Sequence, residues 1–428
     1  MEDLKKQALD YHEQPFPGKY KIFATKAMAD AKDLSLAYSP GVAEPCLEIA
    51  RDPELAYKYT IKGNVVACIS NGTAVLGLGN IGALASKPVM EGKSVLFNKF
   101  AGVQSIDLCV DAPDKDEFVN CVKYLAPSFG GINLEDIKGP DCFYVERKLK
   151  ELMNIPVFHD DQHGTAIVCL AGLINAMDIS KKDIKDLKIV CNGAGAAGIA
   201  CMKLVLAYGA DPQKMFVCDT KGVIYKGRKE GMNEFKEELA NPTIAEKTSL
   251  QEVCKGADVL IGVSSAKAFT DEILMGLNKD PIIFAMANPT PEVLPEDAKK
   301  VRPDCIVATG RSDYPNQINN VMCFPFLFRA ALDTRARQIN EEMKMACAKC
   351  LAGLTREPVP AEVQQLYAGR DLKYGPEYVI PTPFDPRLIE TLPVAVAKAA
   401  MESGAATQQL DLDKYKTELI ERMKAHQL

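Results

Sequence analysis

An alternation of short β-rich runs and helical patterns between about residues 183 and 311 constrains the fold more than any other feature. The strand-like runs are Leu187–Cys191, Met215–Cys218, Val259–Val263, Ile282–Ala287 and Ile306–Ala308. Helical spacing lies between them at Gly198–Tyr208, Ser249–Lys255 and Asp271–Leu277. Strands that alternate with helices in this way predict an α/β fold with a doubly wound, Rossmann-type parallel sheet.

A Gly-x-Gly-x-x-Gly pattern opens the helix after the first of these strands. Its residues are Gly193, Ala194, Gly195, Ala196, Ala197 and Gly198. Glycines at this spacing let the backbone approach a pyrophosphate at a helix N-terminus, where free N–H groups and the helix dipole favour anions. Asp219 ends the next strand, where an acid can bond a ribose hydroxyl. We therefore predict a dinucleotide-binding site here.

The same glycine pattern occurs earlier, at Gly77, Gly79 and Gly82. No acid follows it at the spacing that a nucleotide site needs, so the alternative of a second nucleotide there is not favoured. We expect a loop near the active site in which glycine lets two backbone segments approach.

The chain is expected to have three parts around this region. Residues 1–160 form a substrate and catalytic α/β lobe, residues 161–320 the dinucleotide-binding domain, and residues 321–428 helices that pack back on the first lobe. Strand-like runs in the first lobe are Lys62–Ser70, Ser94–Phe97 and Ile106–Val110, and helical runs near the end are Ala330–Leu354 and Leu392–Ser403. The proline-rich stretch Pro358–Pro386 is expected to be an extended surface connection.

Composition excludes several classes of protein. The chain has 51 Lys and Arg against 57 Asp and Glu, a net charge of −6, so it has no general positive field for nucleic acid or an anionic membrane. No stretch is expected to span a membrane, and Met1–Gln14 lacks the apolar core of a signal peptide. The 14 cysteines, including Cys347 and Cys350, are interpreted as small hydrophobic residues in a reducing compartment, which indicates a cytoplasmic protein.

Two acidic pairs, Glu135-Asp136 and Asp160-Asp161, directly follow apolar runs. Carboxylates at strand ends suit Mg²⁺ or Mn²⁺, although solvated turn acids remain the alternative for each pair. Neighbouring acids converge only on a bend, because on a strand they face opposite ways.

His159 and His163 flank the second acidic pair at a spacing of four, which raises the rival hypothesis of a zinc hydrolase. The pattern departs from the zinc-protease helix: Asp replaces the Glu, no third ligand is evident, and Pro156 with Gly164 argues against a continuous helix. Structural histidines are favoured.

Two further residues stand at places where chemistry is possible. Lys93 follows a glycine and precedes a strand-like run, so it can point into a cleft or lie on the surface. Tyr38 precedes a Ser-Pro-Gly turn, which would fix the ring for chemistry or simply anchor the turn.

Three longer motifs carry a resemblance to a known family. They are LAYSPGVAEP at Leu36–Pro45, SNGTAVLGLGNIG at Ser70–Gly82 and FHDDQHGT at Phe158–Thr165. Together, and in this order, they resemble the malic enzymes in their short microbial form. The resemblance implies oxidative decarboxylation of L-malate to pyruvate and CO₂ with NAD(P)⁺ and a divalent cation, in a homodimer or larger homo-oligomer.

The same resemblance implies roles for individual residues. Lys93 would be the general base and Tyr38 the acid that protonates C3, with Asp160 orienting the lysine. Glu135, Asp136 and Asp161 match the Mg²⁺ or Mn²⁺ ligands. Asn288, Asn319 and Asn320 match amides that line the malate and nicotinamide pocket. A lysine base must lose its proton, and whether its surroundings lower its pKa stays open at this point.

Some features depart from the family pattern or leave a choice open. Ala74 stands where animal-type members have a carboxylate-binding arginine, so the backbone amides of Thr73–Gly79 are expected to do that work. The phosphotransacetylase-like extension of longer members is not in this sequence, so no acyl-phosphate regulation through it is expected.

The coenzyme and the reaction class also leave alternatives. Asp219 suits the free ribose of NAD, whereas Lys221, Arg228 and Lys236 suit the 2′-phosphate of NADP, which is preferred. A metal-free dehydrogenase of the amino-acid type that uses Lys93 is the second hypothesis.

Overall fold

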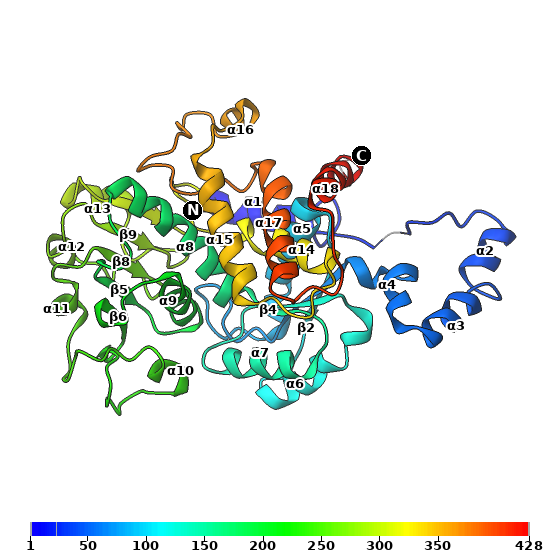
Figure 1. The fold of residues 1–428 in the computed structure, drawn as a ribbon, viewed down its shortest axis with the longest axis horizontal. Helices are drawn as coiled ribbons and strands as arrows, with labels where there is room; N and C mark the ends of the chain where they lie inside the picture. Colours follow the sequence, from blue (N-terminus) through cyan, green and yellow to red (C-terminus); the bar gives the residue numbers. More distant parts are fainter. Residues whose placement is uncertain (1, 23, 427–428) are drawn as a thin grey trace.

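Two largely parallel sheets organise the chain in the computed structural model, which describes residues 2–22 and 24–426 (Figure 1). Met1 and Leu428, which bound the predicted domains, lie outside the described residues. The predicted α/β class with a doubly wound sheet is confirmed.

The first sheet has the strand order β2-β1-β3-β4, and all its pairs are parallel. Its strands are β1 (Val65–Ser70), β2 (Gln104–Cys109), β3 (Gly131–Leu134) and β4 (Val157–His159). The helices between them are α5 (Ala83–Ala101), α6 (Lys115–Lys123) and α7 (Asp141–Leu152), with the short turn η3 (Ala126–Ser128). Because parallel strands end at one edge, the residues that follow β1, β3 and β4 meet there.

One strand prediction in this lobe was wrong. Ser94–Phe97 lies inside the 19-residue helix α5, which buries Met90, Ser94 and Phe97 at helical spacing. The β-rich letters of this short run carry less weight than the long helix that packs on β1 and β2.

The second sheet has the order β10-β9-β8-β5-β6-β7. Its strands are β5 (Ile189–Asn192), β6 (Met215–Asp219), β7 (Gly222–Val223), β8 (Val259–Gly262), β9 (Ile282–Ala285) and β10 (Ile306–Thr309). Only the hairpin partner β7 is antiparallel. The accompanying helices are α9 (Ala196–Tyr208), α10 (Glu234–Glu237), α11 (Leu250–Cys254), α12 (Asp271–Met275) and α13 (Pro295–Val301), with η4 (Pro212–Lys214). The chain runs from β5 to β6 on one side and then to β8 on the other, so the end of β5 is the switch point where such sheets bind ligands.

The helix α8 (Asp160–Ser180) joins the two sheets and packs against α9 and the later helix α15. Contrary to expectation, it includes Gly164, so the segment after His159 is helical. By length and composition this helix could cross a membrane, which was not expected from the sequence. However, 67% of its most apolar window is buried inside the protein. It is therefore a core helix of this fold.

The last part of the chain is helical. Its helices are α14 (Phe324–Asp333), α15 (Glu341–Arg356), α16 (Ala361–Leu366), α17 (Arg387–Glu402) and α18 (Leu412–His426), after the turn η5 (Asn320–Met322). Rings of Phe324 and Phe328 pack edge-on against Phe97 of α5, and Arg329 bonds Asn64 of the first lobe. The stretch that was expected to be extended contains the short helix α16.

The region before β1 is largely exposed. It comprises α1 (Glu2–Glu13), α2 (Ala31–Ala37), α3 (Ala43–Arg51), η1 (Pro53–Leu55), α4 (Ala56–Tyr59) and η2 (Ile61–Asn64). Helices α2, α3 and α4 have no buried residue and extend away from both sheets (Figure 1). We call residues 24–59 the N-terminal arm.

All 14 cysteines are free thiols, and ten of them are buried in the apolar interior. Cys46 on α3 and Cys121 on α6 are the two exposed ones.

Candidate active site

Lys93 lies on α5, where its side chain is 13% exposed and surrounded by acids, although the sequence placed it beside a strand. Its ammonium lies 2.6 Å from Asp160 Oδ2 and 3.1 Å from Glu135 Oε1. It also donates to Asn320 Oδ1 at 3.4 Å and lies 4.8 Å from the centre of the Phe324 ring. The lysine is thus fixed by contacts from three segments that are distant in sequence.

The carboxylates come from the ends of two neighbouring strands. Glu135 and Asp136 follow β3, and Asp160 and Asp161 begin α8 directly after β4. Asp136 has a left-handed backbone (φ 54°), which is the bend that the adjacent acids were predicted to need. Its N–H donates to Asp161 Oδ2 at 2.8 Å.

Burial and mutual repulsion raise the pKa values of Glu135, Asp136 and Asp160. Burial raises the pKa of Glu135 well above its usual range, in spite of Lys93, and raises the pKa of Asp136 to about 7, with Asp161 adding to the shift. The pKa of Asp160 is also raised, chiefly by burial. Burial alone would lower the pKa of Lys93, but Asp160, Glu135 and Asp161 together raise it well above its usual value.

Three of these acids form a group suited to a cation. One carboxylate oxygen each from Glu135, Asp136 and Asp161 lies within 4.8 Å of the other two. Oxygen Oδ2 of Asp136 is buried and has no hydrogen-bond partner. A close set of partly unpaired carboxylate oxygens fits Mg²⁺ or Mn²⁺, which bind oxygen ligands and relieve such repulsion.

The histidine pair does not form a shared ligand set. His163 Nε2 bonds the Glu146 carboxylate at 2.8 Å, and its Nδ1 accepts from Lys344 at 3.1 Å. The ring nitrogens of His159 are buried without a protein partner. Among the described residues, the group with metal-ligand spacing contains carboxylates alone, which does not support the zinc hydrolase hypothesis.

The glycine loop after β5 has the geometry that the pattern predicts. Gly193 has φ 125°, and a Cβ there would meet the Val263 carbonyl oxygen at 2.6 Å. A Cβ on Gly198 would lie 1.9 Å from the Gly193 carbonyl oxygen. Gly195 caps α9 with open space around it, and Ala196 and Ala197 form its first turn. The amides of this turn, with that of Ala194 before it, are placed for an anion.

The glycine loop after β5 lies close to the segment that carries Glu135 and Asp136. Gly139 is three residues after Asp136. A Cβ built on Gly139 would lie 3.7 Å from the Ala196 amide nitrogen, so the two segments are in contact. The segment Glu135–Gly139 therefore connects the carboxylate cluster to the N-terminus of α9.

Asp219 is paired with two cations. Arg228 binds both of its oxygens, at 2.8 and 2.7 Å, and Lys236 Nζ lies 2.7 Å from Oδ2. These hydrogen bonds hold the pKa of Asp219 below its usual value although burial opposes them. Lys221 instead pairs with Glu230 at 2.8 Å.

The amides Asn288, Asn319 and Asn320 occupy different positions. Asn320 contacts Lys93, as described above. Asn319 Oδ1 accepts from the Val321 amide at 3.0 Å. Asn288 follows β9, and its carbonyl oxygen lies 2.4 Å from a Cβ built on Gly77, so this glycine permits a close approach of two backbones as expected.

Backbone amides of the Gly72–Gly82 loop bond Asp136 or other atoms of the loop. The Ala74 N–H donates to the Asp136 carbonyl oxygen at 2.9 Å, and the Leu76 N–H bonds its carboxylate. The amides of Val75 and Leu78 donate within the loop. These four amides already have acceptors, so the expected binding of a substrate carboxylate by the Thr73–Gly79 amides stays a prediction for the remaining ones.

Tyr38 is not part of this cluster of side chains within the chain. It follows α2 on the N-terminal arm and is 70% exposed. Figure 1 places α2 far from the strands that carry the acids.

Three residues near the site were not predicted from the sequence. Phe324 lies against Lys93, and Glu146 and Lys344 contact the two nitrogens of His163. The aromatic run after Asn320 was the available signal for Phe324.

Comparisons with known proteins agree with this arrangement. The family model "Malic enzyme, N-terminal domain" matches residues 17–150, and "Malic enzyme, NAD binding domain" matches residues 162–368. The NADP-dependent malic enzyme of Rhizobium meliloti is 58% identical over 417 residues, which are 97% of this chain and 54% of that protein. That of Halomonas elongata is 56% identical over 95% of this chain and 96% of its own length.

Solved structures give the same result. The crystal structure of malic enzyme from Pyrococcus horikoshii is 40% identical with a TM-score of 0.90, and covers 99% of this chain and 96% of that one. A NAD-dependent malic enzyme from Thermotoga maritima is 39% identical with a TM-score of 0.82, and covers 92% of this chain and 98% of its own. The chain spans about half the length of several curated relatives, such as that from Rhizobium meliloti, and nearly all of others. It belongs to the malic enzyme family, as the three sequence motifs indicate.

Proposed function

We propose that the chain oxidatively decarboxylates L-malate to pyruvate and CO₂ with reduction of NADP⁺, and that it requires a divalent cation. The observation that carries this proposal is the convergence of Lys93 with Glu135, Asp136, Asp160 and Asp161 beside the N-terminus of α9. The named relatives support the nicotinamide chemistry.

Glu135, Asp136 and Asp161 would hold Mg²⁺ or Mn²⁺. When bound, the cation supplies a Lewis acid for the C2 oxygen of malate and a positive charge that offsets the carboxylates around Lys93. The side chains of Asn288, Asn319 and Asn320 supply amide groups for malate and the nicotinamide.

Lys93 acts as the general base. It removes the proton from the C2 hydroxyl as hydride leaves C2 for the nicotinamide, and Asp160 and Asn320 fix the position of its Nζ. The C4 carboxylate of the resulting oxaloacetate then leaves as CO₂. Because the surrounding acids raise the pKa of Lys93, the base form requires that their negative charge be offset.

The surroundings of Asp219 support NADP as the preferred coenzyme. Arg228 and Lys236 bring two positive charges to one carboxylate at the end of β6. Such a pair leaves a net positive charge for a 2′-phosphate, whereas a free acid there would favour the 2′-hydroxyl of NAD.

We infer that Tyr38 serves the active site of a second copy of the chain. The N-terminal arm exposes Leu34, Leu36 and Leu47 by half or more, and Tyr38 by 70%. An apolar surface of this kind on an otherwise polar arm is typical of an interface. In a twofold dimer each arm covers the cleft of its partner, so that Tyr38 can donate a proton to C3 after CO₂ leaves.

Purified chain supplied with malate, NADP⁺ and Mn²⁺ should form NADPH and CO₂ together. EDTA should abolish both products and added Mn²⁺ should restore them. The variant Asp136→Asn should raise the Mn²⁺ dissociation constant by at least about tenfold, measured by electron paramagnetic resonance, because it removes a charged ligand. Asp186→Asn, at an exposed position, is the control. Malate oxidation that is insensitive to EDTA would support the metal-free dehydrogenase instead.

Replacement of Lys93 should remove both directions of the redox step. We expect Lys93→Met to lower kcat for malate oxidation and for pyruvate reduction by about 100- to 10,000-fold, the usual contribution of a general base. Lys99→Met, on an exposed position of the same helix, should retain activity. Circular dichroism checks that both variants fold, and an active, folded Lys93→Met protein contradicts the assignment.

Removal of one cation beside Asp219 should change coenzyme preference. Lys236→Ala should lower kcat/KM for NADP by about 10- to 100-fold, the value of one charge-assisted hydrogen bond, and leave kcat/KM for NAD nearly unchanged. Lys229→Ala, an exposed lysine without this contact, is the matched control. Equal losses with both coenzymes would exclude a role for Lys236 at the 2′-phosphate.

Mixing two inactive variants tests the shared site. Tyr38→Phe and Lys93→Met proteins, mixed after dissociation, should regain about a quarter of wild-type activity, since half of the random dimers are heterodimers with one intact site each. If Tyr38 acts within its own chain, the mixture stays inactive. Analytical ultracentrifugation establishes that the subunits exchange.

A further inference from the structure

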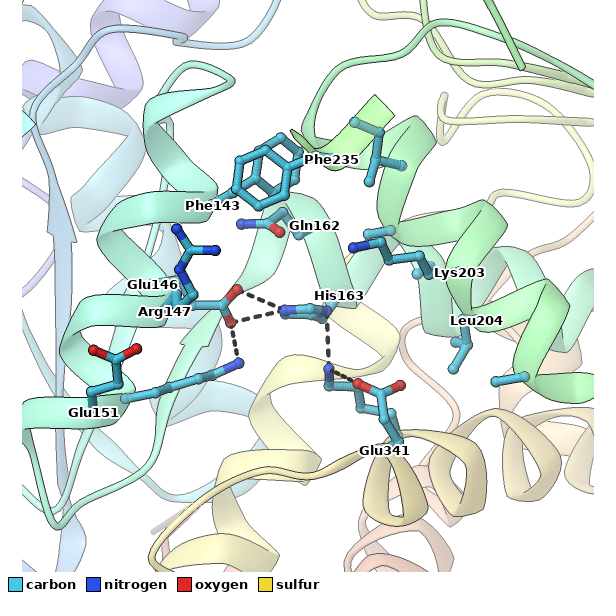
Figure 2. Close-up of a pocket in the computed structure, with 16 residues that line it drawn as sticks. Phe143, Glu146, Arg147, Glu151, Gln162, His163, Lys203, Leu204, Phe235 and Glu341 are labelled. Carbon is cyan, nitrogen blue, oxygen red and sulfur yellow. Dashed lines mark hydrogen bonds and ion pairs between the residues drawn. The ribbon is translucent and has the colours of Figure 1, made fainter. Parts of the chain in front are cut away.

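A cavity of about 570 Å³ lies outside the carboxylate cleft, between α7, the first turns of α8, α9 and α15 (Figure 2). The helix α7 belongs to the first sheet and α9 to the second, so the two sides of the cavity come from the two parts that form the active site. None of the roles proposed above uses this space.

A chain of ionic contacts forms one side of the cavity. The Glu146 carboxylate bonds His163 Nε2 at 2.8 Å and Lys150 at 2.6 Å. On the other side of the ring, Lys344 contacts His163 Nδ1 and pairs with Glu341 at 2.7 Å (Figure 2). Both ring nitrogens of His163 are therefore used by these contacts.

The amide of Gln162 is the group that lacks a partner. Gln162 is only 3% exposed, lines the cavity beside His163, and its buried Nε2 has no hydrogen-bond acceptor (Figure 2). An unpaired buried donor costs about 1 to 3 kcal/mol. A ligand in the cavity that carries an acceptor oxygen would satisfy it.

The rest of the lining indicates the class of ligand. Stacked rings of Phe143 and Phe235, with centroids 4.4 Å apart, form an apolar end, and Ile199 and Leu204 continue it. Arg147 and Lys203 stand half-exposed over the Phe235 ring, and their ion pairs are with the exposed acids Glu234 and Glu238. Exposed pairs of this kind are weak, so both cations are available to an anion.

We propose that this cavity is a second ligand site, which binds a small organic anion with an apolar body and an acceptor oxygen for Gln162. The ligand changes turnover at the catalytic cleft through α8. Asp160 and Asp161 of the cleft and Gln162 and His163 of the cavity are four consecutive residues of this helix. A ligand that touches α7 and α9 at once also alters their separation, on which the contact of Gly139 with Ala196 depends.

The aromatic carboxylate 2-naphthoate is a suitable probe, because it fluoresces and the chain contains no tryptophan. We expect saturable binding to the whole chain with one site per chain, which saturating malate does not abolish and Lys93→Met does not affect. Ala207→Phe, which places a ring at the exposed edge of the cavity, should abolish binding, whereas Ala361→Phe on the exposed start of α16 should not. Gln162→Met should weaken binding by about 3- to 10-fold, the value of one hydrogen bond, without lowering Tm.

The alternatives give different results. The proposed site is wrong if binding is not saturable, or if the Ala207→Phe protein binds the probe equally well. It is also wrong if malate or NADP⁺ competes with the probe, because the probe then lies at the catalytic residues. Inorganic phosphate tests whether charge alone suffices, and binding of phosphate as tight as that of 2-naphthoate contradicts the apolar requirement.

The coupling between the two sites rests on the proposed function. If the bound probe leaves kcat and KM for malate unchanged, the coupling is wrong. Binding itself is measured without turnover, so it is independent of that function.

Discussion

The Lys93 ammonium, enclosed by the carboxylates of Asp160 and Glu135, is the interaction on which the arrangement of the site depends. A buried acid cluster without a cation would be costly, and so would a buried lysine without acids. The pairing brings α5, the end of β3 and the start of α8 to one point. It also sets the charge balance in which any base chemistry of Lys93 must take place, because the same acids that fix the lysine oppose loss of its proton.

The helix α8 connects the carboxylate cluster with the nucleotide domain and the C-terminal helices. Its first turn carries Asp160 and Asp161 at the cleft, its middle is buried against α9 of the nucleotide domain, and its far face packs on α15. The apolar character that makes it resemble a membrane span is a consequence of this burial on most sides. Its first turn carries Asp160, Asp161 and Gln162, and the buried Asn175 further along the helix is hydrogen-bonded to the Ala352 and Val379 carbonyls.

Much of the nucleotide domain was predictable because its signals are local. The strand runs and the glycine loop at Gly193–Gly198 are specified by residues that neighbour each other, and even the bend at Asp136 follows from two adjacent acids that must converge. Ser94–Phe97 failed because a β-rich run of four residues is overridden by the helix that surrounds it. The bond from the Ala74 amide to Asp136 was not predictable, because it is a contact between distant segments.

The role of Tyr38 stays a prediction for a different reason. Its motif is specific, but the sequence does not state whether a residue reaches the cleft of its own chain, and the exposed arm shows that here it does not. The Glu146–His163–Lys344 contacts were likewise invisible, since they join three helices whose packing no spacing rule gives.

The distribution of thiols provides a practical handle on the N-terminal arm. With ten of the 14 cysteines buried, a thiol-reactive dye has two exposed targets, Cys46 on the arm and Cys121 on α6 of the body. After replacement of Cys121 by serine, a solvent-sensitive fluorophore on Cys46 reports directly on whether water or protein surrounds α3, and so follows docking of the arm in real time.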